Sequence, residues 1–239
     1  MKLLSNFYQV SGEVLTHRFD ATAYLVNCGE FSVLIDCGTA EGYEKLIENI
    51  KKCGVEPENI KYIFGTHGHY DHVGAAYLFK EKYGTEVFLH EKDVERVESG
   101  DGMKTTAELL YGKSFTAFKV DRILKGGENF SFGYINIEVI HTPGHTPGGV
   151  CYVLETTGLK VLIAGDTLYG GFSAKIDSNE EDWKKSLDKL CDRQFDLMVI
   201  GHSNPTLLGD AQDRLNDARN SFAHYYNPWF KTFKDKYKY

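Results

Sequence analysis

Short apolar runs alternate along the chain with stretches in which apolar side chains recur at helical spacing. Apolar or alternating runs, bounded by glycine, proline or polar residues, predict strands at residues 7–10, 21–28, 31–36, 60–64, 86–89, 134–140, 149–155, 160–164 and 197–200. Helical spacing predicts helices at residues 41–53, 91–98, 182–191 and 210–226. A further helix is predicted to start near Asp71 and end near Gly84, with Val73, Ala76 and Tyr77 on one face.

The order of these elements predicts a layered α/β architecture. Strands alternate with helices in the first half, strands dominate the middle, and the alternation then returns. Two sheets packed together, with helices outside both, accommodate this order in a single domain over residues 1–239.

Residues 99–119 interrupt the alternation, because they hold several glycines among large apolar side chains. We predict an inserted loop with a helical piece. Two interpretations stay open: a lid over a site, or a surface excursion with its own small apolar cluster.

A cluster of polar side chains follows the predicted strand at residues 60–64. His67, His69, Asp71 and His72 form a H-x-H-x-D-H pattern there. Imidazole nitrogens and carboxylate oxygens are usual ligands of zinc, iron and manganese. Four ligands so close are awkward for one ion and suit two ions roughly 3.5–4 Å apart. A polar turn with chance histidines is the alternative, but three histidines within six positions argue against it.

Further polar side chains come at or just after the ends of other apolar strands, in turns flanked by glycine. These are Asp36, His145, Asp166 and His202. Taken singly, His145, Asp166 and His202 could each be a turn residue or a hydrogen-bonded core residue, but beside the first cluster these three become candidate ligands. We expect two groups of three ligands and one bridging carboxylate: His67, His69 and His145; Asp71, His72 and His202; and Asp166.

The motifs H-x-H-x-D-H, T-P-G-H-T-P-G, A-G-D-T-L and G-H occur in this order between residues 67 and 202. In these motifs the chain closely resembles the metallo-β-lactamase-fold hydrolase superfamily. The resemblance implies a four-layer αβ/βα sandwich with a dinuclear metal site at one edge of the two sheets. It also implies that His145 rather than His141 is the ligand. Asp36 would support the metal loop without touching an ion.

Within that superfamily, the glyoxalase II-like thioesterases and the acyl-homoserine lactonases resemble this chain at all seven positions. The commonest β-lactamases have cysteine in place of Asp166, and flavodiiron proteins have glutamate in place of His69. Lactonases have a tyrosine where Tyr169 stands, three residues after Asp166. Tyr169 would then assist catalysis and bind the substrate at its carbonyl group; the alternative is an aromatic residue of the pocket wall.

The resemblance implies a metal-dependent hydrolase with two divalent ions, zinc in the first place and iron or manganese as alternatives. A hydroxide bridging the two ions would attack the carbonyl of an ester, thioester or lactone. Asp71 would steer the hydroxide and pass its proton to the leaving group. One alternative is a mononuclear iron-dependent oxygenase of the persulfide dioxygenase type, using His67, His145 and Asp166. Another is a non-catalytic metal-dependent binding module, which the intact ligand set argues against.

The charge balance and the apolar runs bound the partners. The chain has 27 Lys and Arg against 34 Asp and Glu, a net charge of −7, with no basic run before its last few positions. This balance disfavours nucleic acid as a partner, and the resemblance to the hydrolases implies a small-molecule substrate. No apolar run approaches the roughly 18 residues of a membrane span, and the N-terminus does not look like a signal peptide. Five scattered cysteines without a C-x-x-C pattern favour a cytoplasmic protein.

The last segment, residues 210–239, predicts a helical tail rich in aromatic residues. Aromatic side chains recur at helical spacing at Phe222, Tyr225, Tyr226, Trp229, Phe230 and Phe233. The tail would dock this face on the body of the domain, or it would form the contact of a homodimer.

Overall fold

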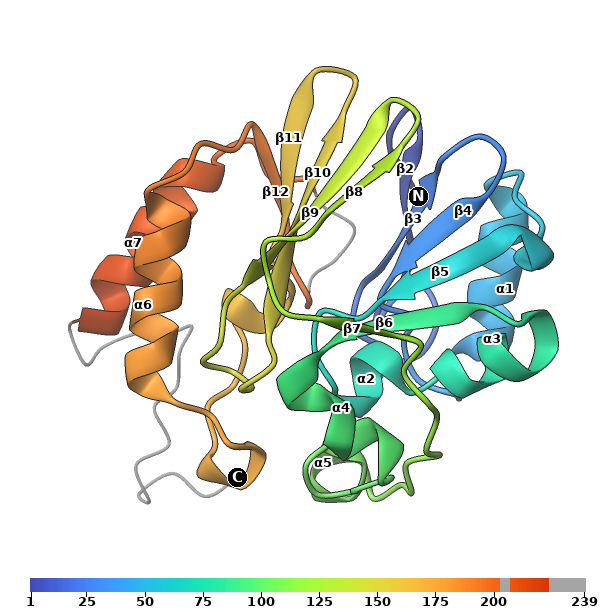
Figure 1. The fold of residues 1–239 in the computed structure, drawn as a ribbon, viewed down its shortest axis with the longest axis horizontal. Coiled ribbons are helices and arrows are strands. Elements are labelled where there is room, and N and C mark those ends of the chain that lie inside the picture. Colours follow the sequence, from blue (N-terminus) through green and yellow to red (C-terminus); the bar gives the residue numbers. More distant parts are fainter. Residues whose placement is uncertain (203–206, 224–239) are drawn as a thin grey trace.

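The computed structural model describes residues 1–202 and 207–223. Two sheets face each other, and helices cover the outer face of each sheet (Figure 1). Helices α1 and α3 lie outside the first sheet, and helices α6 and α7 lie outside the second. The predicted four-layer αβ/βα sandwich is therefore confirmed.

The first sheet changes from antiparallel to parallel along its strand order. Its seven strands are, in order, β1 (Lys2–Leu4), β2 (Phe7–Ser11), β3 (Ala23–Asn27), β4 (Ser32–Ile35), β5 (Ile60–Phe64), β6 (Glu86–His90) and β7 (Arg122–Leu124). Strands β1 to β4 pair antiparallel, and β4 to β7 pair parallel. Parallel neighbours need long crossover connections, which here contain α1 (Tyr43–Lys52), α2 (Tyr70–Val73), α3 (Ala76–Tyr83), α4 (Glu91–Glu98) and α5 (Ala107–Tyr111).

The second sheet is mainly antiparallel. Its strand order is β12 (Leu197–Val199), β11 (Leu159–Ile163), β10 (Val150–Thr156), β9 (Ile135–His141) and β8 (Asn129–Phe132). Only β11 and β12 pair parallel, and α6 (Glu180–Cys191) lies between them in the chain. Helix α7 (Ala211–Ala223) follows and packs beside α6.

Apolar side chains fill the space between the sheets and the spaces under the helices. Within the first sheet, the ring centroids of Phe64 and Phe88 lie 4.6 Å apart. Across the two sheets, the ring centroids of Phe64 and Tyr152 lie 5.7 Å apart. Outside, Leu46 of α1 and Trp183 of α6 are fully buried against their sheets. Burying one large apolar side chain stabilises the fold by about 1.5–3 kcal/mol, so these layers hold the sheets in place.

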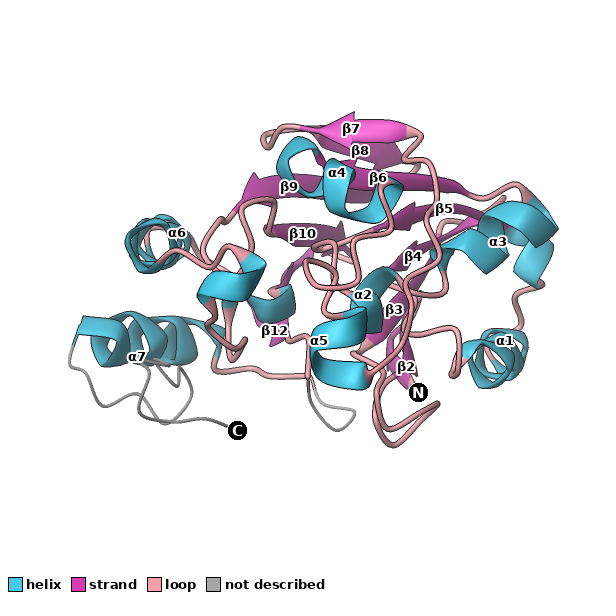
Figure 2. Cartoon of the chain, turned by 90° about the horizontal axis from the view of Figure 1, so that it is seen from below, coloured by secondary structure: helices cyan, strands magenta, loops and turns pink. Residues whose placement is uncertain are grey.

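The fold brings the carboxyl ends of six strands to one edge. Strands β4, β5 and β6 run parallel, so the turns after them leave the first sheet at the same edge. Strands β9, β11 and β12 end at the facing edge of the second sheet, because β9 and β11 both pair antiparallel with β10. Hydrogen bonds tie the edges together, among them those from Val150 N to Thr66 O at 2.8 Å and from Tyr24 Oη to Ile200 O at 2.8 Å. Figure 2 looks onto this edge, where α2 and α5 lie.

The helix that we predicted between Asp71 and Gly84 is interrupted, and this part of the prediction is wrong. Helix α2 ends at Val73, and α3 begins at Ala76. The Asp71 carbonyl accepts from Ala21 N at 3.1 Å, and Ala75 N donates to Gly38 O at 2.9 Å. Tertiary partners thus replace the helical hydrogen bond between Asp71 and Ala75, and the chain bends there.

Residues 99–119 contain one short helix, α5, in a longer loop. Phe115 and Phe118 are buried in the core cluster under the first sheet. The predicted tail is described only as far as α7, so the aromatic residues from Tyr225 onward lie outside the described residues. No described helix is both long enough and apolar enough to cross a membrane.

Candidate metal centre

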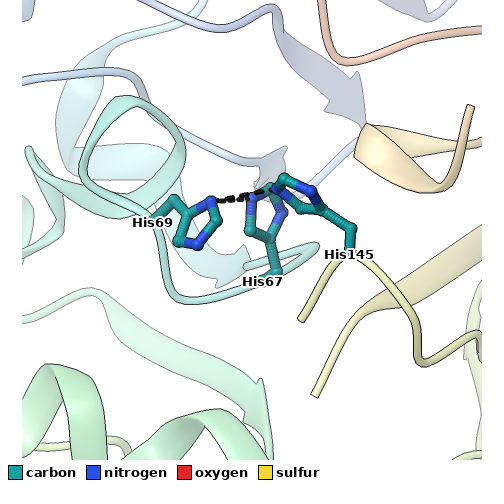
Figure 3. A group of neighbouring side chains, drawn as sticks. All are labelled: His67, His69 and His145. Carbon is teal, nitrogen blue, oxygen red and sulfur yellow. Dashed lines mark hydrogen bonds between the residues drawn. The ribbon is translucent and has the colours of Figure 1, made fainter. Parts of the chain in front are cut away.

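Three imidazole nitrogens meet at the edge where the sheets end, and we call their residues the histidine group. His67 and His69 lie in the turn after β5, and His145 lies in the turn after β9. His67 Nε2 is 2.9 Å and His145 Nε2 is 3.1 Å from His69 Nδ1 (Figure 3). Because a neutral imidazole has one proton and one lone pair, three converging nitrogens suit a shared cation better than a hydrogen-bonded chain.

A second set of side chains, the Asp71 group, lies beside the first and consists of Asp71, His72 and His202. His202 Nε2 is 3.3 Å and His72 Nε2 is 3.7 Å from Asp71 Oδ2. The ligand atoms within each group lie within 4.8 Å of one another, which is close enough for one ion per group.

Asp166 lies between the two groups, in a 3₁₀ turn that follows β11. Its Oδ1 is 3.3 Å from His72 Nε2, and its Oδ2 is 3.3 Å from His202 Nε2 and 3.4 Å from His145 Nε2. One carboxylate therefore reaches both groups. The structure brings all seven candidate ligands together, and His67, His72 and Asp166 form a further set whose ligand atoms lie within 4.8 Å of one another.

The donor set fits divalent cations. His72 Nε2 and Asp166 Oδ1 are buried and lie 3.3 Å apart as an ion pair, but neither makes a hydrogen bond of normal geometry among residues 1–202 and 207–223. An unsatisfied buried polar atom costs about 1–3 kcal/mol, and coordination of a cation would remove that cost. Five imidazoles and two carboxylates match the nitrogen and oxygen ligands of zinc, iron and manganese.

Asp36 orients the ligands from behind, after the end of β4. Its Oδ2 accepts from His72 Nδ1 at 2.8 Å, and its Oδ1 accepts from Thr66 N at 2.8 Å. A proton on His72 Nδ1 leaves the lone pair of Nε2 directed into the centre. Asp36 holds a left-handed backbone conformation (φ 58°), which costs about 1–3 kcal/mol in a residue other than glycine. The structure thus places Asp36 where the resemblance implied.

Glycines next to the ligands leave room that a larger residue would fill. His145 Nδ1 donates to Gly171 O at 2.6 Å, so its Nε2 is free to face the centre. A Cβ atom at Gly201 would lie 2.1 Å from Asp166 Oδ1. The glycine of the G-H motif is therefore required for Asp166 and His202 to approach each other.

The two groups differ in their electrostatics. Burial, together with the neighbouring histidines, holds the pKa of His67 and of His69 well below the usual value, so both rings are neutral. Burial would also lower the pKa of His202, but the charge of Asp166 and hydrogen bonds to Asp166 and Asp71 raise it to about 10. Burial would raise the pKa of Asp166, yet His202 and His72 hold it well below its usual range. Asp166 and the protonated histidines of the Asp71 group thus form paired charges, and a cation bound there would displace the protons from those histidines.

His141 does not join either group. Its ring stacks on His90 with centroids 3.8 Å apart, and its Nε2 donates to Pro147 O at 3.0 Å. His90 is almost fully buried at the start of α4, where its Nδ1 accepts from Lys92 N at 3.3 Å. This stack supports the loop of His145 from outside the centre.

The stack predicts a loss of stability in acid. Burial, and then the neighbouring His141, lower the pKa of His90 to about 4. Below the usual pKa of about 6.5, the unfolded chain binds a proton that the folded chain does not, so stability falls as pH drops from 6.5 towards 4. The measurement is the free energy of unfolding in urea at pH 7.5 and at pH 5. We expect the difference between the two pH values to be about 1–2 kcal/mol smaller in His90→Asn, which keeps a helix-capping oxygen, than in the original protein. His17→Asn is the matched control, and an unchanged pH dependence in His90→Asn would contradict the assignment.

A cavity of about 620 Å³ opens onto the centre. His69, Asp71, His145, Asp166 and His202 contribute to its floor. Most of its walls come from two segments that carry large side chains: Thr106, Leu109, Leu110 and Tyr111; and Tyr169, Phe172, Ser173, Lys175 and Ile176. The segment 99–119 therefore forms one wall of the cavity through α5, whereas the sequence left its place open.

Two tyrosines line this cavity, one from each of these two segments. Tyr169 has a left-handed backbone (φ 68°), and its Oη accepts from Arg214 Nη1 at 3.4 Å. Tyr111 faces Asp71, and burial together with the carboxylates of Asp71 and Asp166 raises the pKa of Tyr111 far above its usual value. Sequence reasoning found Tyr169 and missed Tyr111, because no motif surrounds residue 111 and only the fold brings α5 to Asp71.

Comparisons with known proteins agree with this geometry. A family model described as the metallo-beta-lactamase superfamily matches residues 18–202, which include all seven candidate ligands. The chain is 30% identical over 208 residues to the probable metallo-hydrolase YqgX of Bacillus subtilis, covering 85% of this chain and 94% of the relative. It is 32% identical over 213 residues to the hydroxyacylglutathione hydrolase GloC of Haemophilus influenzae, covering 84% and 95%.

Solved structures of metallo-beta-lactamases are also similar to this chain. The metallo-beta-lactamase GOB-18 of Elizabethkingia meningoseptica is similar with a TM-score of 0.76 and 26% identity, over 93% of this chain and 90% of that one. A mutant metallo-beta-lactamase of Cronobacter sakazakii has a TM-score of 0.79 at 19% identity, over 93% of this chain and 94% of that one, which shows the fold alone. The sandwich, the clustered ligands and these matches together establish that the chain belongs to the metallo-beta-lactamase superfamily and is a metal-dependent hydrolase.

Proposed function

We propose that this protein uses two divalent ions, zinc in the first place, to hydrolyse an ester, thioester or lactone of a small molecule. The observation that carries the proposal is the position of Asp166 between two complete groups of ligands, at the floor of the cavity. The two groups and Asp166 would hold the ions, which would stabilise both the nucleophile and the carbonyl oxygen in hydrolysis.

Ions held in the two groups would supply a bound water whose pKa is lowered from about 15.7 to near 7, and a Lewis acid for the carbonyl oxygen. Asp71 contributes a base. Burial would raise its pKa, but His72 and His202 lower it below the usual value, so Asp71 is a carboxylate at neutral pH. Its oxygens border the cavity, where they accept a proton from the nucleophile and return it to the leaving group.

The cavity walls bind the part of the substrate away from the reacting carbonyl. Leu109 and Leu110 on one wall and Phe172 and Ile176 on the other offer apolar surface. Such walls exclude water and hold an apolar portion of a small molecule. The relative GloC is named a hydroxyacylglutathione hydrolase, and a hydroxyacylglutathione is a thioester, which supports a thioester among the candidate substrates.

Tyr169 supplies a hydrogen-bond donor near the carbonyl group. Its oxygen accepts from Arg214 Nη1 at 3.4 Å, and Tyr169 lines the cavity that opens onto the centre. We expect Tyr169→Phe to lower kcat by roughly 10- to 100-fold with unchanged metal content, since loss of one donor to an oxyanion costs up to about 10²–10³. Tyr134→Phe, which changes an exposed tyrosine in the turn between β8 and β9, is the control. Full activity in Tyr169→Phe would reduce Tyr169 to a wall residue.

A substrate screen tests the proposal. Protein loaded with zinc, manganese or iron is assayed against panels of S-acyl thioesters, aryl esters and lactones, beside protein stripped with a chelator. We expect turnover of at least one class that is lost on stripping and restored by metal. Complete metal loading without turnover of any class would contradict the proposal. One iron per chain with oxygen uptake would favour the dioxygenase instead.

A further inference from the structure

A buried ion pair lies directly outside the histidine group, on helix α4. Asp93 is fully buried and Arg96 is 6% exposed, and Arg96 Nε lies 3.3 Å from Asp93 Oδ1. Burying two charges costs several kcal/mol each, and a pair repays that cost only when further hydrogen bonds satisfy both partners. The partners of this pair therefore indicate what it holds in place.

The Asp93 carboxylate binds both loops of the histidine group. Its Oδ2 accepts from Gly68 N at 2.8 Å and from Thr146 Oγ1 at 2.8 Å, and its Oδ1 accepts from Gly148 N at 3.0 Å. Gly68 separates His67 from His69, and Thr146 directly follows His145. One side chain thus joins the turn after β5 to the turn after β9.

Close contact explains two glycines of the motifs. A Cβ atom at Gly68 would lie 2.7 Å from Arg96 Cδ, and one at Gly148 would lie 2.6 Å from Asp93 Cγ. Only glycine lets both loops approach the pair at hydrogen-bonding distance.

Arg96 extends the same network to the cavity walls. Its Nη1 donates to Lys104 O at 3.1 Å, and its Nη2 lies 3.6 Å from Asp177 Oδ2. The Lys104 ammonium also pairs with Asp177. Lys104 precedes the wall of α5, and Asp177 follows the wall that ends at Ile176.

We propose that Asp93 and Arg96 are positioning residues: Asp93 sets the spacing of the three imidazoles that bind one ion, and Arg96 fastens both cavity walls to that ion site. Neither Asp93 nor Arg96 belongs to the histidine group or lines the cavity. The pair acts through the loops that carry His67, His69 and His145 and through the segments on either side of Lys104 and Asp177. The role of Arg96 towards substrate rests on the proposed function, whereas the role of Asp93 towards metal does not.

Zinc affinity tests Asp93 without reference to activity. In Asp93→Asn, the amide nitrogen would face either Gly148 N and Arg96 Nε or Gly68 N and Thr146 Oγ1, so at least one backbone hydrogen bond is lost while the size is kept. Metal-free protein is titrated with zinc against a chromophoric chelator, and the step belonging to the histidine group is the one that His145→Ala removes. We expect that step to weaken about 10- to 100-fold, as for loss of other residues that orient metal ligands.

The control breaks a different ion pair. Glu138 of β9 and Arg193, which follows α6, form a bidentate ion pair, and Glu138→Gln breaks it. It should leave both zinc steps unchanged. Unchanged zinc affinity in Asp93→Asn, or an equal loss in Glu138→Gln, would overturn the proposal.

Two further variants keep the test decisive. If Asp93→Asn does not fold, Thr146→Val removes only one hydrogen bond to Asp93, and we expect a zinc affinity about three- to tenfold weaker; no change would overturn the proposal.

Arg96→Met keeps the side-chain stem over Gly68 and should raise KM about three- to tenfold, with kcat within about twofold and zinc affinity retained. An unchanged KM would refute the role of Arg96. Weakened zinc binding in a protein that hydrolyses none of the substrates would leave the role of Asp93 standing and reject the proposed function alone.

Discussion

Replacing Asp71 with alanine is expected to lower turnover at least about 10³-fold and to weaken the ion held by the Asp71 group. Asp71 Oδ2 lies 3.3 Å from His202 Nε2, and the carboxylate borders the cavity. The substitution removes a ligand and also the base, and loss of a base alone costs about 10²–10⁴. Elemental analysis and initial rates with any substrate found in the screen measure the two effects.

Asp71→Asn separates these effects, because an amide can still coordinate through its oxygen but cannot accept a proton at neutral pH. We expect more metal to be retained in Asp71→Asn than in Asp71→Ala, with activity still low. Full activity in a metal-replete Asp71→Ala would refute the role of Asp71 as a base.

Replacing Gly144 with alanine is expected to lower the free energy of unfolding by roughly 3 kcal/mol and to weaken metal binding as well. Gly144 has a positive φ of 149°, and its Cβ atom would lie 2.3 Å from Trp183 Cβ. Overpacking costs about 1–3 kcal/mol, and the backbone strain adds to it. Because Trp183 packs against His145, with ring centroids 5.7 Å apart, the displacement would reach the histidine group. Urea unfolding and zinc titration measure the two losses.

A second glycine provides the matched control for Gly144. Gly158 also has a positive φ, of 79°, but nothing lies within 4 Å of a Cβ atom there. Gly158→Ala should therefore cost only about 1 kcal/mol, from backbone strain alone, and should leave zinc affinity unchanged. Equal losses in the two variants would show that the contact with Trp183 is unimportant.

The sequence singled out seven candidate ligands, because most of their signals are local. The turns after apolar strands hold them, and carboxyl ends of parallel strands share an edge of a sheet. His67 and His69 come after β5, whereas Asp166 and His202 come after β11 and β12 of the other sheet, so strand ends indicate an edge within each sheet and the packing of the two sheets brings the candidates together. The resemblance added the choice of His145 over His141, which spacing could not decide and the stack of His141 on His90 now explains.

Other features escaped prediction because they depend on distant contacts. The break between α2 and α3 follows from hydrogen bonds to Ala21 and Gly38, which helical periodicity does not reveal. Asp93 occupies the first turn of α4, where an acidic residue usually serves only the helix dipole. Tyr111 reaches Asp71 only because α5 folds back over the edge of the sheets.

The central claim is that two ions bind side by side between the turns that end β5, β9, β11 and β12. Anomalous diffraction at the zinc edge, from crystals of zinc-loaded protein, tests it most directly. The account predicts two peaks per chain, one among His67 Nε2, His69 Nδ1 and His145 Nε2 and one among Asp71, His72 and His202, with Asp166 touching both. A single peak, or peaks away from these atoms, would contradict it.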